Sequence, residues 1–185
     1  AASSVVVFNF LSWERSGLVS IDVTNTAFSE AEYLQVKDSH GRICPSHVKK
    51  TESSIILSFD AILASMAYEV FTLSEAAAPE TSAVTVTAEK MENRFYSISF
   101  DSNANLVSIY DKRSNGKYLL KANLIKIFED KPGGETAWNI DLEYQNKEWI
   151  LDRADSVEVV ECSAIRGVLR VKRSFHLSTI TQDII

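Results

Sequence analysis

Carboxylate and aromatic side chains are concentrated in one short segment, FEDKPGGETAWNIDLEYQ (residues 128–145). Its acids are Glu129, Asp130, Glu135, Asp141 and Glu143, with Trp138 and Tyr144 among them. Paired carboxylates perform the chemistry of glycosidases, and aromatic rings stack on sugar faces. A polar, acid-rich stretch is also typical of a solvated loop. The segment therefore predicts sugar contact or a plain surface loop, and its residue types leave both open.

Other kinds of catalytic site find little support in the sequence. The three histidines, His40, His47 and His176, have no acid or second histidine at a spacing typical of metal ligands. There is no G-x-S-x-G motif and no phosphate-binding glycine loop. The basic stretch RGVLRVKR (residues 166–173) predicts a solvated strand face, with an anion or partner site as the alternative.

The composition describes an ordinary globular chain of 185 residues, 45% of them hydrophobic and 24% charged. Its formal net charge of −6 argues against binding to nucleic acid, because phosphate contacts need a basic face. No apolar run reaches the roughly 18 residues that a membrane span requires, so no membrane partner is expected. Cys44 and Cys162 are far apart, and no N-x-Ser/Thr site occurs, which favours reduced thiols in the cytoplasm.

Alternating apolar and polar residues predict an all-β chain in two domains. The first, residues 1–80, is expected to be a small antiparallel β-sandwich, and residues 81–185 begin a second β domain. The small, acidic stretch at residues 74–83 is interrupted by Pro79 and predicts a linker. Residues 29–38 could form a helix on composition, although their neighbours favour a strand.

The ends of the sequence suggest a fragment of a longer polypeptide. The chain begins with Ala1 and stops at TITQDII, inside an apolar-alternating run. A strand cut there would leave an unpaired edge, which leaves room for a homo-oligomer.

Five motifs together resemble the C-terminal β-domains of glycoside hydrolase family 38 α-mannosidases. They occur in the family's order and extend over nearly the whole chain: VVVFNFLSWERSGLVSIDV, VKDSHGRICPSH, AYEVF, MENRFYSISFDSNANLVSIYDKRSNGKYLL and FEDKPGGETAWNID. Phe10 stands where the family usually has proline, and Ala104 or Asn105 where a turn glycine is usual. In the last motif Thr136 and Asn139 each replace an aspartate, and the whole motif is most similar to the cytosolic and bacterial branch.

The resemblance implies a retaining exo-α-mannosidase that releases terminal mannose from oligosaccharides through a covalent intermediate. It implies that residues 81–185 are the first part of a larger, galactose-mutarotase-like β-supersandwich. The family's zinc ion and catalytic residues belong to an N-terminal barrel, upstream of this sequence. No catalytic or metal-binding residue is therefore expected here, and the chain alone is predicted to be inactive.

For this chain, the resemblance implies packing against the catalytic barrel and a loop at the rim of the substrate cleft. Trp138 could stack on a sugar, while Asp130, Asn139 and Asp141 could bind its hydroxyls. Alternatively, Trp138 anchors the loop on its own sheet or seals a domain interface. A second hypothesis is a stand-alone carbohydrate-binding or scaffolding β-sandwich, and a third is an interaction domain that uses Arg170 and Lys172.

Overall fold

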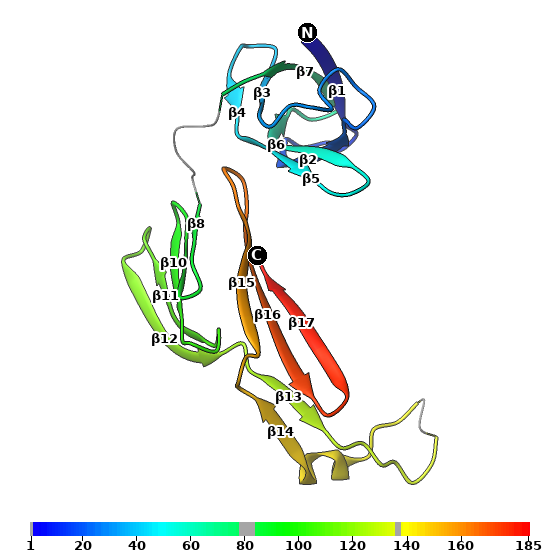
Figure 1. The fold of residues 1–185 in the computed structure, drawn as a ribbon, viewed down its shortest axis with the longest axis vertical. Coiled ribbons are helices and arrows are strands. Elements are labelled where there is room, and N and C mark those ends of the chain that lie inside the picture. The colour runs from blue at the N-terminus through cyan, green and yellow to red at the C-terminus, as the bar shows by residue number, and fades with distance from the viewer. Residues whose placement is uncertain (1, 78–83, 136–137) are drawn as a thin grey trace. The chain divides into compact units, whose positions relative to one another are not determined.

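The computed structural model describes residues 2–77, 84–135 and 138–185 of the chain (Figure 1). Internal contacts divide it into two compact units, the first within residues 1–83 and 163–165, the second within residues 84–162 and 166–185. Each unit is described by itself below. Over the described ranges no helix has the length and apolar character that crossing a bilayer requires.

The first unit is a small antiparallel β-sandwich. Its strands are β1 (Ala2–Asn9), β2 (Arg15–Asp22), β3 (Leu34–Lys37), β4 (Ile43–Cys44), β5 (Ser46–Lys50), β6 (Ile55–Leu63) and β7 (Ala67–Glu75). One sheet has the order β1-β7-β3-β4 and the other β2-β6-β5. Alternate residues of β6, among them Leu57 and Phe59, are buried, and Phe59 meets Phe71 of the opposite sheet at 4.9 Å between ring centroids. The period-two pattern therefore builds the core.

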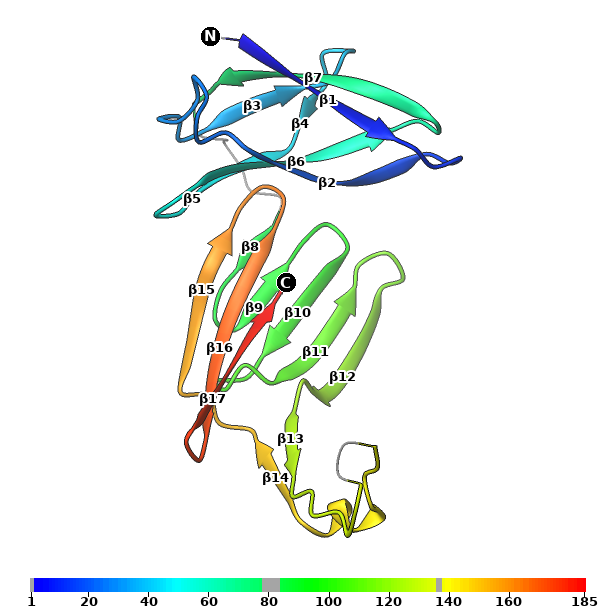
Figure 2. The ribbon, with the colours of Figure 1, turned by 90° about the vertical axis from the view of Figure 1, so that its right-hand side faces the viewer.

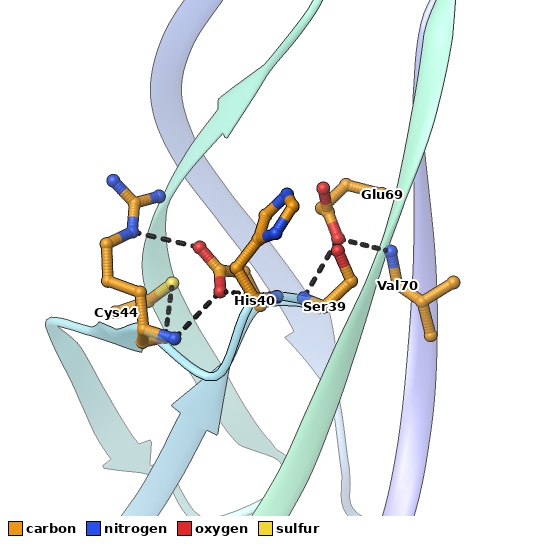
Figure 3. A network of polar contacts seen from close by, with 7 residues as sticks. Ser39, His40, Cys44, Glu69 and Val70 are labelled. Atoms are coloured by element: carbon orange, nitrogen blue, oxygen red, sulfur yellow. Dashed lines mark hydrogen bonds and ion pairs between the residues drawn. The ribbon is translucent and has the colours of Figure 1, made fainter.

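The turn after β3 is held by hydrogen bonds to two carboxylates (Figure 3). Asp38 accepts from the backbone nitrogens of His40 and Arg42 and from Arg42 Nε, the last at 2.9 Å. Glu69 of β7 accepts from the nitrogen of Ser39 at 3.0 Å. The pKa values of both carboxyls lie below their ordinary values. Hydrogen bonds from Ser39 lower that of Glu69, whereas at Asp38 burial raises the pKa but its bonds with Arg42 outweigh that effect.

The second unit contains three sheets, whose strands are spread out toward the viewer in Figure 2. Its elements are β8 (Thr85–Val86), β9 (Lys90–Glu92), β10 (Tyr96–Phe100), β11 (Leu106–Asp111), β12 (Gly116–Ala122), β13 (Ile125–Phe128), the 3-10 helix η1 (Leu142–Asn146), β14 (Glu148–Leu151), β15 (Ser156–Cys162), β16 (Gly167–Phe175) and β17 (Ser178–Ile184). A five-stranded sheet, β12-β11-β10-β9-β8, and a three-stranded sheet, β15-β16-β17, enclose a common core. That core includes Met91, Phe100, Leu169 and Val171.

A buried arginine joins these two sheets. Arg173 of β16 is fully buried and donates to the backbone oxygen of Asn103 at 2.7 Å and to Gln182 at 3.2 Å. Its Nε has no hydrogen-bond partner among the described residues. Burial lowers the pKa of Arg173, while the nearby Asp101 carboxylate opposes that effect. Burying a guanidinium charge is costly, and the hydrogen bonds from Arg173 to these neutral oxygens offset part of that cost.

Strands β13 and β14 form a separate two-stranded ribbon that extends beyond the larger sheets (Figures 1 and 2). Ile125 pairs with Leu151 at its base and Phe128 with Glu148 at its far end. Trp149 of β14 packs edge-on against Phe175 of β16, with 5.3 Å between ring centroids. This contact fixes the ribbon to the three-stranded sheet, so the segment beyond Phe128 is carried outward.

The structure confirms the all-β prediction. Within residues 29–38 it has the strand β3 and no helix, so the alternative helix in this described stretch is wrong. The expected linker falls mainly on residues 78–83, outside the described residues, so the boundary between residues 80 and 81 stays a prediction. Ala104, rather than Asn105, occupies the position of the turn glycine, because its φ is 56°.

Candidate functional site

The loop between β13 and β14 contains the acid-rich segment, described for residues 129–135 and 138–147. It surrounds a pocket of about 220 Å³ lined by Glu129, Asp130, Lys131, Asp141, Glu143, Tyr144, Asn146 and Lys147. The antiparallel pairing of β13 with β14 brings the two ends of the loop together, and the backbone nitrogen of Glu129 donates to Lys147 at 3.0 Å. The hairpin therefore gathers residues that are up to 18 positions apart in the sequence.

Glu129 is neutralised by two lysines at this pocket. Lys147 Nζ lies 2.8 Å from one carboxylate oxygen and Lys131 Nζ lies 3.0 Å from the other. These two lysines, Lys147 foremost, lower the pKa of Glu129 below its ordinary value. An ionised carboxylate has no proton to donate at neutral pH, so Glu129 is unsuited to the role of general acid.

Asp141 shapes the loop with its carboxylate. One oxygen accepts from the backbone nitrogen of Gly133 at 2.8 Å, and the other accepts from Asn139 Nδ2 at 2.7 Å. Its backbone oxygen also accepts from the nitrogen of Tyr144, which begins the turn of η1. Tyr144 in turn packs edge-on against Phe128 at 5.2 Å between ring centroids. Both carboxylate oxygens thus have partners within the loop, although each retains lone pairs for a further donor.

Apolar side chains of the loop face solvent. Trp138 is 90% exposed, and its backbone nitrogen donates to the backbone oxygen of Glu135 at 2.8 Å. Ile140 and Leu142 are 65% and 79% exposed. Trp138 therefore does not anchor the loop on its own sheet, which removes one of the alternatives that the sequence left open. An exposed tryptophan on a projecting ribbon is suited to meet a ligand or another protein surface.

The pocket has the chemistry of a polar binding site. Carboxylates, two lysines, an amide and a phenol line it, and such groups accept from and donate to sugar hydroxyls. Its acids outnumber its bases, which disfavours an anionic ligand. Within the described ranges no group of three or more His, Cys, Asp or Glu is arranged so that it could hold a metal ion.

The histidines, the cysteines and the basic strand that the sequence singled out lie outside the pocket. The imidazole of His40 takes no part in the contacts drawn in Figure 3, and His176 lies in a tight turn with a φ of 51°. Both cysteines are free thiols, Cys44 buried and Cys162 exposed. Arg170 forms two hydrogen bonds with Asp183, at 2.7 and 2.8 Å, so its charge is paired within its own sheet.

The four predicted site residues do not all meet at the pocket. Asp130 and Asp141 line the pocket, and Asn139 is hydrogen-bonded to Asp141. Trp138 is not among the lining residues and is 90% exposed. Lys131, Asn146 and Lys147 also line the pocket, although no sequence pattern singled them out. A prediction that β13 and β14 pair would have found Lys147, since that register brings it beside Glu129, and Lys131 lies only two residues from Glu129 along the chain.

The sequence of the second unit matches a known protein family. The model of the glycosyl hydrolases family 38 C-terminal domain matches residues 91–185. The chain belongs to glycosyl hydrolase family 38. The match includes the pocket loop and every strand of the second unit from β10 onward, so all of these are parts of the family 38 C-terminal domain.

Two solved structures share the fold of this family 38 chain. An α-mannosidase from Enterococcus faecalis V583 is similar over 93% of the chain, with a TM-score of 0.61 and 16% sequence identity. A family 38 protein from Enterococcus faecalis is similar over 93%, with a TM-score of 0.60 and 17% identity. The chain spans only 23% and 24% of their lengths. No curated protein matches its sequence.

Proposed function

We propose that this chain is the C-terminal β portion of a retaining exo-α-mannosidase that acts on oligosaccharides with terminal mannose. The family model carries this proposal, because it identifies residues 91–185 with the C-terminal domain of family 38. The similar α-mannosidase from Enterococcus faecalis supports the substrate class. The free cysteines are compatible with a reducing compartment, and the cytoplasm remains our proposed location.

Retaining hydrolysis requires one carboxylate as nucleophile and one carboxylic acid close to it. The pocket's carboxyls are poorly suited to those roles, because Glu129 is ion-paired and Asp141 is hydrogen-bonded within its loop. We therefore assign nucleophile, acid and zinc to a separate catalytic domain, and this chain's part is to pack on that domain and shape its cleft.

The ribbon of β13 and β14 is the part of this chain best suited to reach a sugar. Trp138 would stack on a pyranose face, because its exposed indole ring is free to cover the apolar side of a sugar. Asn139 would donate to a hydroxyl, and Asp130 and Asp141 would accept from others. The hydrogen bonds of Asp141 to Gly133 and Asn139 hold the loop in shape, which reduces the entropy lost on binding.

The test is a steady-state assay of the complete α-mannosidase polypeptide that contains this chain, with a mannose oligosaccharide as substrate. Trp138→Ala is expected to raise KM about tenfold and to leave kcat nearly unchanged, because stacking contributes to binding away from the cleaved bond. Trp13→Ala, a second exposed tryptophan in the first unit, is the control. Unchanged kinetics in Trp138→Ala would exclude the sugar contact, and the absence of mannosidase activity would exclude the larger proposal.

The stand-alone carbohydrate-binding module remains the second candidate, favoured by the exposure of Trp138 beside a polar pocket. A glycan array with the isolated chain separates the two. Mannose-specific binding without any catalytic domain encoded upstream would support the module, and silence with such a domain encoded would support the mannosidase.

A further inference from the structure

Both ends of the β13–β14 ribbon are hydrogen-bonded to the rest of the second unit through side-chain amides. At the entry, Asn123 lies two residues before β13 and exchanges two hydrogen bonds with Gln182 of β17, at 2.7 and 3.3 Å. At the exit, Asn105 Nδ2 donates to the backbone oxygen of Asp152, the residue after β14, at 3.0 Å. Both attachments belong to the part of the chain where the ribbon leaves the larger sheets (Figure 2).

Arg173 of β16 joins the two attachments. Its Nη1 donates at 3.2 Å to Gln182, which holds the entry. Its Nη2 donates to the backbone oxygen of Asn103 at 2.7 Å and to Asn105 Oδ1 at 3.4 Å. Asn103 in turn accepts from the backbone nitrogen of Ala154 at 3.2 Å, close to the exit. One guanidinium therefore contacts the residues that hold each end of the ribbon.

A buried arginine at this position fixes direction. Arg173 is fully buried, and well-packed apolar residues commonly replace a buried charge without loss of stability. Apolar contacts have no preferred direction, so they would allow neighbouring segments to slide. The donors of a guanidinium lie in one plane at fixed angles, so Arg173 holds Gln182 and the turn at residues 101–105 in set positions.

The backbone at the entry is set at the same point. Asn123 has a φ of 62°, in the left-handed region that asparagine adopts more readily than most residues. Its side chain meets Gln182 and also lies 3.4 Å from the backbone oxygen of Ala104. The direction in which the chain enters β13 therefore depends on a residue that is bonded to the arginine network.

We propose that Arg173 is a positioning residue, which holds both ends of the ribbon and so fixes where its loop, with Trp138, meets a sugar. The loop begins beyond Phe128, at the far end of the ribbon, so a small rotation at the base moves it by a larger distance. A loop that is held in place loses less entropy on binding. The role in sugar binding rests on the function proposed above, whereas the hold on the ribbon does not.

The first test is hydrogen–deuterium exchange, read by mass spectrometry, on the complete polypeptide that contains this chain. Asn123→Gly keeps the left-handed backbone and removes only the amide. It should speed exchange about tenfold in Ile125–Phe128 and Glu148–Leu151, and leave β10 and β16 nearly unchanged. Arg173→Lys should act in the same direction, because a compact ammonium lacks the planar fork.

Met91→Ala is the matched control, because it removes core packing from β9, a strand that pairs with β8 and β10 and not with the ribbon. It should speed exchange in β10 and β16 at least as much as in the ribbon. If Arg173→Lys fails to fold by circular dichroism, Asn123→Gly decides. Unchanged exchange of the ribbon in Asn123→Gly overturns the proposal, as does a rise shared equally with β10 and β16, which would assign the network to general core stability.

The second test is steady-state kinetics of the same polypeptide with a mannose oligosaccharide. Asn123→Gly should raise KM about threefold or more with kcat nearly unchanged, and by less when Trp138→Ala is already present, since a loop without its ring gains less from being positioned. If Trp138→Ala raises KM and Asn123→Gly does not, the positioning role in sugar binding is overturned and the proposed function stands. If neither changes KM while exchange rises only in the ribbon, the sugar contact is overturned and the hold on the ribbon is supported.

Discussion

Several acidic side chains of this chain accept hydrogen bonds from nearby backbone nitrogens, although carboxylates can also bind ligands. Asp141 has the carboxylate of a sugar-binding residue, yet both its oxygens hold the loop together through Gly133 and Asn139. Asp38 and Glu69 do the same for the turn after β3. A short acidic side chain in a turn commonly binds backbone nitrogens nearby, so acids in a polar loop identify a turn as readily as a site.

Ala104 provides a prediction at this scale. Its φ of 56° lies in the left-handed region, which costs an alanine about 1 kcal/mol relative to glycine. Ala104→Gly relieves that strain but removes a fully buried methyl group that contributes about 0.8 kcal/mol, so urea unfolding should show a change of less than about 0.5 kcal/mol. The control is Ala122→Gly in β12, where ordinary strand geometry predicts a loss of about 0.5–1 kcal/mol. If Ala104→Gly costs more than Ala122→Gly, the turn does not strain Ala104.

At the scale of elements, the second unit depends on a close approach of β16 to β8. A Cβ atom at Gly167 would overlap Val86 Cγ2 and lie 2.9 Å from Val84 Cγ1. Gly167→Ala should cost about 1–3 kcal/mol of the free energy of unfolding, because the strands must move apart. Gly17→Ala in β2 meets no atom within 4 Å and should change stability by less than about 0.5 kcal/mol in a thermal or urea unfolding series. Equal effects of the two substitutions would contradict the close approach.

An ion pair between Glu92 of β9 and Lys112, in the turn after β11, leads to a prediction about the pH dependence of stability. Lys112, 2.6 Å away, and Lys90 lower the pKa of Glu92 from 4.5 to about 2. A lowered folded-state pKa means that the pair stabilises the fold above about pH 4.5, and that this contribution disappears as the pH falls towards 2. The stability difference between the natural chain and Glu92→Gln should be largest near neutral pH and vanish near pH 2, in urea unfolding at each pH. Added salt should reduce it, since the pair is partly exposed.

At the scale of the whole molecule, we expect this chain to hydrolyse no aryl α-mannoside, with or without added zinc. The described residues contain no group suited to zinc, and Glu129, the pocket carboxyl with a lowered pKa, is ion-paired. The measurement is release of the aryl alcohol, with a family 38 α-mannosidase as positive control. Mannosidase activity that stays with the chain through successive purification columns would contradict the assignment of catalysis to another domain.

Much of the fold was predictable because strands are patterned locally. Leu57 and Phe59 alternate with the polar Ser58 and Asp60, and that period of two predicts β6. The site was less predictable. Lys131 is a close sequence neighbour of Glu129, but the contact of Lys147 with Glu129, 18 residues away, depends on the β13–β14 register. The exposure of Trp138 likewise depends on where the ribbon carries the loop, which no nearby residue encodes.

The sequence by itself determined that this protein is all-β, that its acids and tryptophan gather in residues 128–145, and that its motifs resemble those of family 38. These properties depend on the order of residues and on their period-two alternation, which can be seen in short segments without information about the rest of the chain. Only the tertiary structure decided that Asp141 serves its own loop and that Trp138 meets solvent. The physical reason is that both depend on a pairing between segments that are distant in sequence, such as Phe128 with Glu148, and the packing of the whole unit selects that pairing.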